Sequence, residues 1–386
     1  MGDRCDKRKH ALPPEFCNMS TSYGKKLNIS IYGGSHDDCI GIKALGLPRG
    51  FKIDRGELET FMARRAPGTS PYATQRREAD TPIFLSGIDE NGIICGDELH
   101  AVIKNTNKRS SDYKNTEFIP RPSHADMAAM LKYGKDVDLR GGGHFSGRLT
   151  APMCIVGGIC LQYLKTLGIE IGAHIYAVGG VRDDGFELAS VSHTELNLLK
   201  QRADFPVLNT DAGEEMKRRI REAAENKDSV GAIIECAAVG LPAGLGEHIF
   251  DGMENRISAI VFGIPAVKGI EFGNGFACAD LRGSQNNDAI TVRDGKICTK
   301  TNNCGGILGG MTNGMPLVFR AAIKPTPSIS KEQDSVDMNT LTPAKLTIHG
   351  RHDPCIALRA VPVFEAALAI AVCDALLSEE SDSNEI

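Results

Sequence analysis

Residues 151–167 make a segment that is apolar on almost every side, and Gly168 follows it in the way glycine commonly ends a helix. A helix of this kind has no polar face to turn toward water, so it must be buried. Strand-like stretches lie on both sides of it in the chain, at residues 27–32, 83–85, 101–103 and 230–239. They do not alternate with helices regularly enough for a doubly wound parallel sheet. We therefore expect a single large α+β domain with strands packed around buried helices.

Three further helices are expected outside this segment. Asp54 is a suitable N-cap for a helix over residues 54–65, because Glu57 follows three residues later. Residues 214–226 are rich in charge and predict an exposed helix, and Pro362 is expected to open a last helix that runs to about residue 377. The expected organisation is a flexible arm over residues 1–26, one domain over residues 27–377 and an acidic tail over residues 378–386.

Charge and composition exclude several classes of function. The 386 residues carry 44 Lys and Arg against 49 Asp and Glu, a net charge of −5, so no broad basic surface is available for nucleic acid. Trp is absent and aromatic residues make up 5%, which argues against a base-stacking platform. The longest apolar runs, residues 151–161 and 366–373, fall short of the roughly 20 residues that span a bilayer.

The 12 cysteines are scattered along the chain, several within apolar runs, and no two are spaced as C-x-x-C. Such cysteines are typical of small buried side chains rather than of a disulfide framework or a zinc site, and no other metal site is expected. A reduced, soluble protein of the cytoplasm, bound to neither nucleic acid nor membrane, is therefore the expectation.

Short segments that combine glycine or proline with a charged side chain recur along the whole chain. Glycines let backbone N–H groups approach a phosphate, and Arg side chains add bidentate contacts to it. His36 and His124 lie in turns bounded by glycine or proline rather than on apolar faces. A histidine can protonate a leaving phosphate near neutral pH. Taken together, the segments indicate an enzyme that handles phosphate, although each one alone is as typical of an ordinary turn.

Six ordered segments of this kind carry a resemblance to one family. They are Gln75-Arg-Arg-Glu78, Arg121-Pro-Ser-His-Ala-Asp126, Leu281-Arg-Gly-Ser-Gln-Asn286, Gly305-Gly-Ile-Leu-Gly-Gly310, Gly350-Arg-His-Asp-Pro-Cys355 and Arg359-Ala-Val-Pro362. With them the chain resembles the chorismate synthase family over residues 24–377.

The resemblance implies a fold, a reaction and a cofactor. The fold is a β-α-β sandwich with central helices between antiparallel sheets, typically in a homotetramer. The activity is that of a lyase of the shikimate pathway, which leads to the aromatic amino acids. It converts 5-enolpyruvylshikimate 3-phosphate to chorismate by 1,4-anti elimination of phosphate. The cofactor is reduced FMN, so NADPH enters only indirectly, through flavin reduction by the protein itself or by a separate flavin reductase.

The resemblance also assigns roles to residues. Catalytic roles are implied for His36 toward the departing phosphate, His124 toward the reduced flavin and Asp353 in proton removal. Cofactor contacts are implied for Ser146, Ala266, Gly309, Lys324, Pro325, Thr326, Pro327, Ser328 and Arg351. Substrate or phosphate contacts are implied for Arg65, Arg76, Arg77 and Arg148.

The chain departs from the family pattern at several positions. Around His36, in the segment Gly33-Gly-Ser-His36 and the residue after it, Gly34 stands where the family usually has Glu and Asp37 stands where it usually has Gly. Asp37 and Asp38 would either keep His36 protonated or repel an anionic substrate. His144 and Phe145 replace the usual run after three glycines, and Pro71 stands where Arg is common. Asp37 and Asp38 favour one alternative, a non-catalytic flavin- or phosphate-binding paralogue, whereas the retained His36, His124, Asp353 and most of the basic residues favour the enzyme. An oxidoreductase that uses NADPH ranks last, because no Gly-x-Gly-x-x-Gly turn follows a strand.

Overall fold

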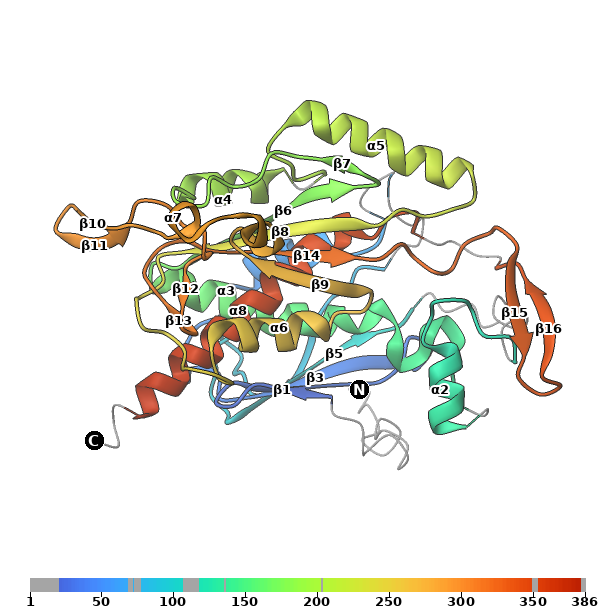
Figure 1. The fold of residues 1–386 in the computed structure, drawn as a ribbon. Helices are drawn as coiled ribbons and strands as arrows, with labels where there is room; N and C mark the ends of the chain where they lie inside the picture. Colours follow the sequence, from blue (N-terminus) through green and yellow to red (C-terminus); the bar gives the residue numbers. More distant parts are fainter. Residues whose placement is uncertain are drawn as a thin grey trace.

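Two antiparallel sheets enclose a layer of helices in the computed structural model, which describes residues 21–68, 72, 78–106, 118–134, 137–202, 204–348 and 353–382 (Figure 1). The first sheet has the order β1 (Ser22–Tyr23), β2 (Asn28–Tyr32), β3 (Cys39–Leu45), β5 (Glu98–Lys104) and β4 (Ile83–Ser86). The second has the order β7 (Val181–Arg182), β6 (Glu170–Val178), β8 (Ala232–Val239), β14 (Leu317–Ile323) and β9 (Val267–Phe272). The predicted α+β sandwich with helices between antiparallel sheets is confirmed.

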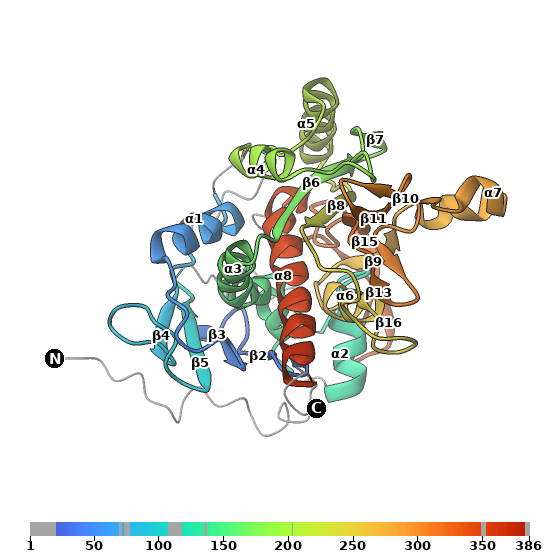
Figure 2. The same cartoon turned by 90° about the vertical axis from the view of Figure 1, so that its left-hand side faces the viewer.

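Helices α3 (Thr150–Thr166) and α8 (Ala357–Asp382) run through the middle of the molecule, with a sheet on either side (Figure 2). Their backbones approach closely at Gly157, where an added Cβ would lie 2.2 Å from Cβ of Ala366. The same layer contains α1 (Arg55–Arg65) and α6 (Met253–Phe262), which both pack against α8. One hydrophobic core therefore runs from the first sheet through the helices to the second sheet.

The remaining elements lie outside this sandwich. Helices α4 (His193–Gln201) and α5 (Thr210–Glu225) cover the outer side of the second sheet, while α2 (Asp126–Tyr133) and the one-turn α7 (Gly283–Asn286) lie at opposite ends of the molecule (Figure 1). Three hairpins complete the fold: β10 (Ile290–Arg293) with β11 (Lys296–Thr299), β12 (Ile307–Leu308) with β13 (Met311–Thr312), and β15 (Gln333–Asp337) with β16 (Thr342–Leu346).

Most of the predicted elements are present. Asp54 caps α1 by accepting a hydrogen bond of 2.9 Å from the backbone N–H of Glu57, as expected. The buried helix predicted over residues 151–167 is α3, and the strand predicted over residues 230–239 is β8. The exposed helix begins earlier than expected, at Thr210, because the Asn209 side chain accepts from two N–H groups of its first turn.

The prediction for the last helix is wrong at both ends. Helix α8 begins at Ala357, so Pro362 lies inside it rather than in its first turn. A proline there removes one backbone hydrogen bond, and the dense burial of the surrounding side chains offsets that loss. The helix also continues to Asp382, so residues 378–382 are not a frayed tail. At the other terminus, residues 22 and 23 pair with Ser30 and Ile29 as β1 and do not belong to a flexible arm.

Helix α8 contains an apolar stretch that is longer than the runs predicted from the sequence. The stretch Ala357–Glu379 is long and apolar enough to cross a membrane by length and composition, because its four charged residues are single and far apart: Arg359, Glu365, Asp374 and Glu379. However, 89% of its most apolar part is buried inside the fold. In this molecule the stretch is the central helix of the core.

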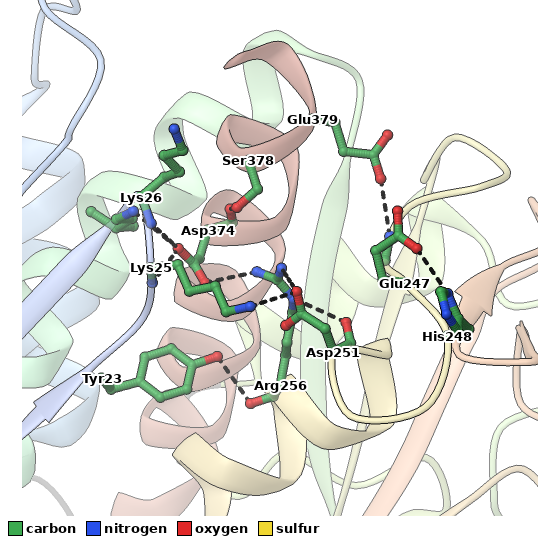
Figure 3. A network of polar contacts seen from close by, with 12 residues as sticks. Tyr23, Lys25, Lys26, Glu247, His248, Asp251, Arg256, Asp374, Ser378 and Glu379 are labelled. Atoms are coloured by element: carbon green, nitrogen blue, oxygen red, sulfur yellow. Dashed lines mark hydrogen bonds and ion pairs between the residues drawn. The ribbon is translucent and has the colours of Figure 1, made fainter. Parts of the chain in front are cut away.

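A buried carboxylate ties the N-terminal strand to the far end of α8 (Figure 3). One oxygen of Asp374 accepts hydrogen bonds from the backbone N–H groups of Lys25, Lys26 and Leu27, at 2.8, 2.8 and 3.0 Å. Its other oxygen accepts a bond of 2.9 Å from Nη1 of Arg256 on α6. Three elements that are distant in the sequence are thereby fixed at one point, which explains why residues 21–26 are ordered against the core.

Candidate active site

Three consecutive glycines in the 3₁₀ turn η3 (Arg140–Phe145), just before α3, form the floor of the candidate site. Gly141, Gly142 and Gly143 have φ angles of +59°, +92° and +52°, which L side chains rarely adopt. An added Cβ on Gly141 would lie 2.4 Å from Cε1 of His36, and one on Gly142 would lie 3.4 Å from Nε2 of His124. The two predicted catalytic histidines therefore meet at neighbouring residues of one loop.

His36 lies in a tight turn between β2 and β3 that is bonded to the glycine loop. The backbone N–H of Ser35 donates to the carbonyl of Gly143 at 3.1 Å, and its hydroxyl donates to the carbonyl of Arg140 at 2.9 Å. The Ser35 hydroxyl also lies 3.3 Å from Nδ1 of His36. The ring is 9% exposed, so it is nearly enclosed while remaining at the surface of the loop.

Two departures from the family pattern face each other in this turn. The carboxylate of Asp37 accepts a hydrogen bond of 2.6 Å from the backbone N–H of Gly34. A side chain at Gly34 would begin 3.3 Å from that carboxylate. Asp37 thus stabilises the turn that carries His36, while Asp38 is exposed. His144, a third departure, bonds through Nδ1 to the carbonyl of Gly33 at 2.9 Å and so joins the loop to the same turn.

A buried carboxylate and a buried guanidinium orient His124. Its Nδ1 lies 2.6 Å from an oxygen of Asp126, the first residue of α2. Arg121 donates from Nε to the other oxygen of Asp126 at 2.6 Å. Burial alone would raise the pKa of Asp126, but hydrogen bonds from Arg121 and His124 hold that pKa well below its usual range. Asp126 is therefore ionised and accepts a hydrogen bond from the Nδ1–H of His124, which leaves Nε2 of His124 facing Gly142.

Part of the predicted cofactor segment packs against the His124 turn. Nζ of Lys324 donates to the carbonyl of Ser123, and the Arg121 guanidinium donates to the Ser328 hydroxyl at 3.3 Å. The backbone N–H of Lys324 donates to the carbonyl of Ala266 at 3.0 Å. Pro325, Thr326 and Pro327 lie between these anchors. The structure therefore brings Ala266 and residues 324–328 to His124.

The side chains of this segment suit an anionic cofactor such as FMN. Partial burial, and then the neighbouring charge of Lys268, lower the pKa of Lys324, and the opposite charge of a bound anion would offset both effects. The Thr326 hydroxyl is buried, and within the described part of the chain it has no hydrogen-bond partner. Ser146 lies next to the glycine loop, because a Cβ added to Gly142 would lie 3.4 Å from the Cβ of Ser146. A cationic donor and an unused hydroxyl, both in the segment that packs against the His124 turn, match the donors that a phosphate and a flavin ring require.

Arg65 and Arg148 lie in a buried ion-pair network rather than at a surface open to a ligand. They are 2% and 6% exposed, and both pair with Asp80. Arg148 also pairs with Glu78 at 3.0 Å, and Arg65 donates to the carbonyl of Gly147 at 3.0 Å. Burial would raise the pKa of Asp80, yet the two guanidinium charges lower it. This placement gives the two arginines internal partners and offers no support for direct contact with substrate.

Asp353 is linked to the same network. Its carboxylate pairs with Nη1 of Arg359 at 2.8 Å, and Nε of Arg359 donates to the backbone carbonyl of Arg65 at 3.2 Å. The side chain of Asp353 is 11% exposed. Asp353 is therefore held at the N-terminal end of α8, next to the end of α1.

One described residue among those predicted, Gly309, is not brought to this site. Gly309 lies in the β12–β13 turn, beside the start of α6, and the length of β14 separates it from Lys324. Arg76, Arg77 and Arg351 lie outside the described residues.

Sequence reasoning assigned no role to Asp126, Asp80 or Asn105. A signal for Asp126 was present, because it stands two residues after His124 within one motif. Asp80 and Asn105 had no such signal, since their partners are 15 to 71 residues away in the chain.

Comparison with known proteins agrees with this arrangement. The family model for chorismate synthase matches residues 27–377. The chorismate synthase of Lancefieldella parvula is 46% identical over 375 residues, which cover 95% of this chain and 98% of that protein. The chorismate synthase of Korarchaeum cryptofilum is 40% identical, with coverage of 92% and 97%.

A crystal structure of chorismate synthase superposes with a TM-score of 0.72 at 29% identity, covering 92% of this chain and 93% of that one. The alternative of a non-catalytic paralogue gains no support from these relatives. Matches of this identity over nearly the full length show descent as well as fold, and the chain belongs to the chorismate synthase family.

Proposed function

We propose that the protein is a chorismate-forming lyase that eliminates phosphate from 5-enolpyruvylshikimate 3-phosphate with the help of reduced FMN. The observation that carries the proposal is the approach of His36 and His124 to adjacent glycines of one loop. Two imidazoles on one floor can act on the two sides of a single reaction centre.

The elimination breaks one C–O bond and one ring C–H bond. The electrons of the C–H bond form one ring double bond, the existing ring double bond shifts toward the C–O carbon, the C–O pair leaves with phosphate, and no net oxidation occurs. His36 donates a proton to the departing phosphate, and the Asp353 carboxylate assists removal of the ring proton. When bound, reduced flavin supplies transient electron density that favours the loss of phosphate.

His124 serves the cofactor side of the site. Because the Nδ1–H of His124 donates to Asp126, His124 presents Nε2 toward the glycine loop. Lys324, with Ser328 and the Thr326 hydroxyl, would hold the anionic part of FMN. Donors fixed in place before the ligand arrives stabilise developing charge without reorganisation.

We also propose that the protein assembles into a homotetramer in the cytoplasm. The β10–β11 hairpin supports assembly because its apolar side chains Ile290, Val292 and Ile297 are 76%, 67% and 78% exposed. The described cysteines are free, which suits a reducing compartment. Reduced FMN would come from NADPH, through this protein or through a separate flavin reductase.

Anaerobic turnover tests the function. Purified protein is mixed with chemically reduced FMN and 5-enolpyruvylshikimate 3-phosphate, and chorismate and phosphate are followed together. Equal release of the two products is expected, and oxidised FMN in place of reduced FMN should abolish it. Binding of FMN and substrate without either product would contradict the proposal and would restore the non-catalytic alternative.

A further inference from the structure

We propose that Asn105 is a positioning residue for His36, which it holds against the glycine loop through a clamp on the turn at residues 34–38. The proposal rests on the proposed function in one respect only: it assumes that the position of the His36 ring matters for turnover. The placement of the ring itself can be tested without turnover.

The side-chain amide of Asn105 bridges two carbonyls of the His36 turn. Nδ2 donates to the carbonyl of Gly34 at 3.1 Å and to that of Asp37 at 2.9 Å. The backbone N–H of Asn105 donates to the carbonyl of Asp38 at 3.0 Å. Asn105 is 5% exposed, so these bonds are formed away from water. Since two carbonyls can only accept, the NH₂ group must be the one that faces them.

The other end of the amide is held as firmly. Oδ1 of Asn105 accepts a hydrogen bond of 3.1 Å from Nε of Arg148. Arg148 is fixed in turn by Asp80 and Glu78, and Asp80 also pairs with Arg65. The buried ion-pair network therefore ends on the turn of His36. Nε and Nη1 of Arg148 donate to Asn105 and Asp80, and Nη2 lies 3.0 Å from a carboxylate oxygen of Glu78. Arg148 therefore has a role in support of the site.

Replacing Asn105 by Asp exchanges the side-chain NH₂ group, which bridges the two carbonyls, for a carboxylate oxygen. Asn105→Asp keeps the shape and the oxygen that faces Arg148, but it puts an acceptor against two carbonyl oxygens. The turn must then shift, and His36 moves with it. Misplacement of a reacting group by about 1 Å can cost on the order of 10²-fold in rate.

The chain offers a matched control. Asn302 is 2% exposed, and its Nδ2 donates to the carbonyls of Leu188 and Pro316, both at 2.8 Å. Asn302→Asp therefore makes the same chemical change to the same kind of bridge. It does so near the start of β14 in the second sheet, whereas His36 lies between two strands of the first sheet.

Two readouts are compared for wild type, Asn105→Asp and Asn302→Asp as full-length protein. One is kcat and KM for chorismate formation, and the other is the NMR resonance of the His36 ring in histidine-labelled protein, assigned with His36→Gln. Asn105→Asp is expected to lower kcat by roughly tenfold to a hundredfold with little change in KM, and to shift the His36 resonance. Asn302→Asp is expected to leave kcat and that resonance at their wild-type values, whatever stability it loses.

The proposal is overturned if folded Asn105→Asp keeps the wild-type His36 resonance, whether or not its kcat falls. Should Asn105→Asp fail to fold, Asn105→Ser replaces it, because a hydroxyl retains one donor but cannot bridge both carbonyls, and the same shift is expected. If the wild-type protein forms no chorismate, the proposed function fails, and the His36 resonance still decides whether Asn105 positions the ring.

Discussion

The carboxylate of Asp126 determines which nitrogen of His124 carries a proton, because it accepts from Nδ1 at 2.6 Å and is itself held by Arg121. A neutral imidazole has one N–H, so fixing it on Nδ1 frees Nε2 for the side that faces the glycine loop. The same arrangement of a buried carboxylate behind a histidine orients the catalytic base in many unrelated enzymes.

Replacing this carboxylate should impair turnover without removing the histidine. For Asp126→Asn we expect kcat to fall on the order of 10²-fold or more, because an amide no longer enforces the Nδ1 proton. The measurement is kcat for chorismate formation with reduced FMN. In a His124→Ala background, Asp126→Asn should cause no further loss. Multiplicative losses in the double variant would show that Asp126 acts independently of His124.

At this scale, local signals in the sequence point to residues that the structure brings together. His36 and His124 stood out because glycine or proline bounds their turns, and both lie against the glycine loop. The substrate contacts of Arg65 and Arg148 stay predictions, and no local signal indicated that both would pair with the buried Asp80. An arginine in the sequence indicates a positive charge, but only the fold shows with which carboxylate that charge forms an ion pair.

The central helices set the geometry of the elements. A methyl group on Gly157 of α3 would meet backbone and side-chain atoms of Ala366 on α8 at 2.2 to 2.5 Å. A methyl group on the next residue, Gly158, would meet the ends of the Leu58 and Phe61 side chains at 2.6 to 3.0 Å. Side-chain ends can move aside, whereas the backbone of a packed helix cannot.

Two neighbouring substitutions test this difference. Gly157→Ala is expected to lower the free energy of unfolding by about 1–3 kcal/mol through overpacking. Gly158→Ala should cost clearly less, since both variants gain the same helix propensity of about 1 kcal/mol and only the first must separate the helices. The measurement is chemical denaturation monitored by circular dichroism. Equal stability of the two variants would mean that α3 and α8 are not packed backbone to backbone at this point.

Element boundaries show where sequence reasoning stops. The apolar pattern identified α3, and the capping residues identified α1, because both signals are local. The start of α8 was misplaced because proline is usual in a first turn, whereas here the surrounding core stabilises a helix with proline inside it. The two five-stranded sheets could not be derived, since their registers depend on contacts between distant strands.

For the whole molecule, a buried histidine on the outer side of the second sheet links stability to pH. His174 is 0% exposed, with Nδ1 at 3.1 Å from Asp183 and Nε2 at 2.8 Å from Glu235. Both nitrogens face acceptors, so the ring is an imidazolium. Burial would lower the pKa of His174, but the bonds to the two carboxylates raise it above its ordinary value.

A raised pKa in the folded state fixes the direction of the pH effect. The stabilisation from His174 is complete below the ordinary imidazole pKa of about 6.5 and is lost as the pH rises through the folded-state value. We expect the denaturation midpoint of the wild type to decrease as the pH rises through the folded-state pKa. The midpoint of His174→Gln should change less over the same pH range. His248→Gln, which changes an exposed histidine, is the control and should follow the wild type. Parallel curves for wild type and His174→Gln would rule out His174 as the cause.

The glycine loop joins His36 and His124 in one catalytic site. The rate of anaerobic chorismate formation by His36→Ala and His124→Ala tests this arrangement directly. Each variant is therefore expected to lose on the order of 10²-fold or more in kcat while remaining folded. Wild-type turnover by either variant would remove that histidine from the mechanism and contradict the claim.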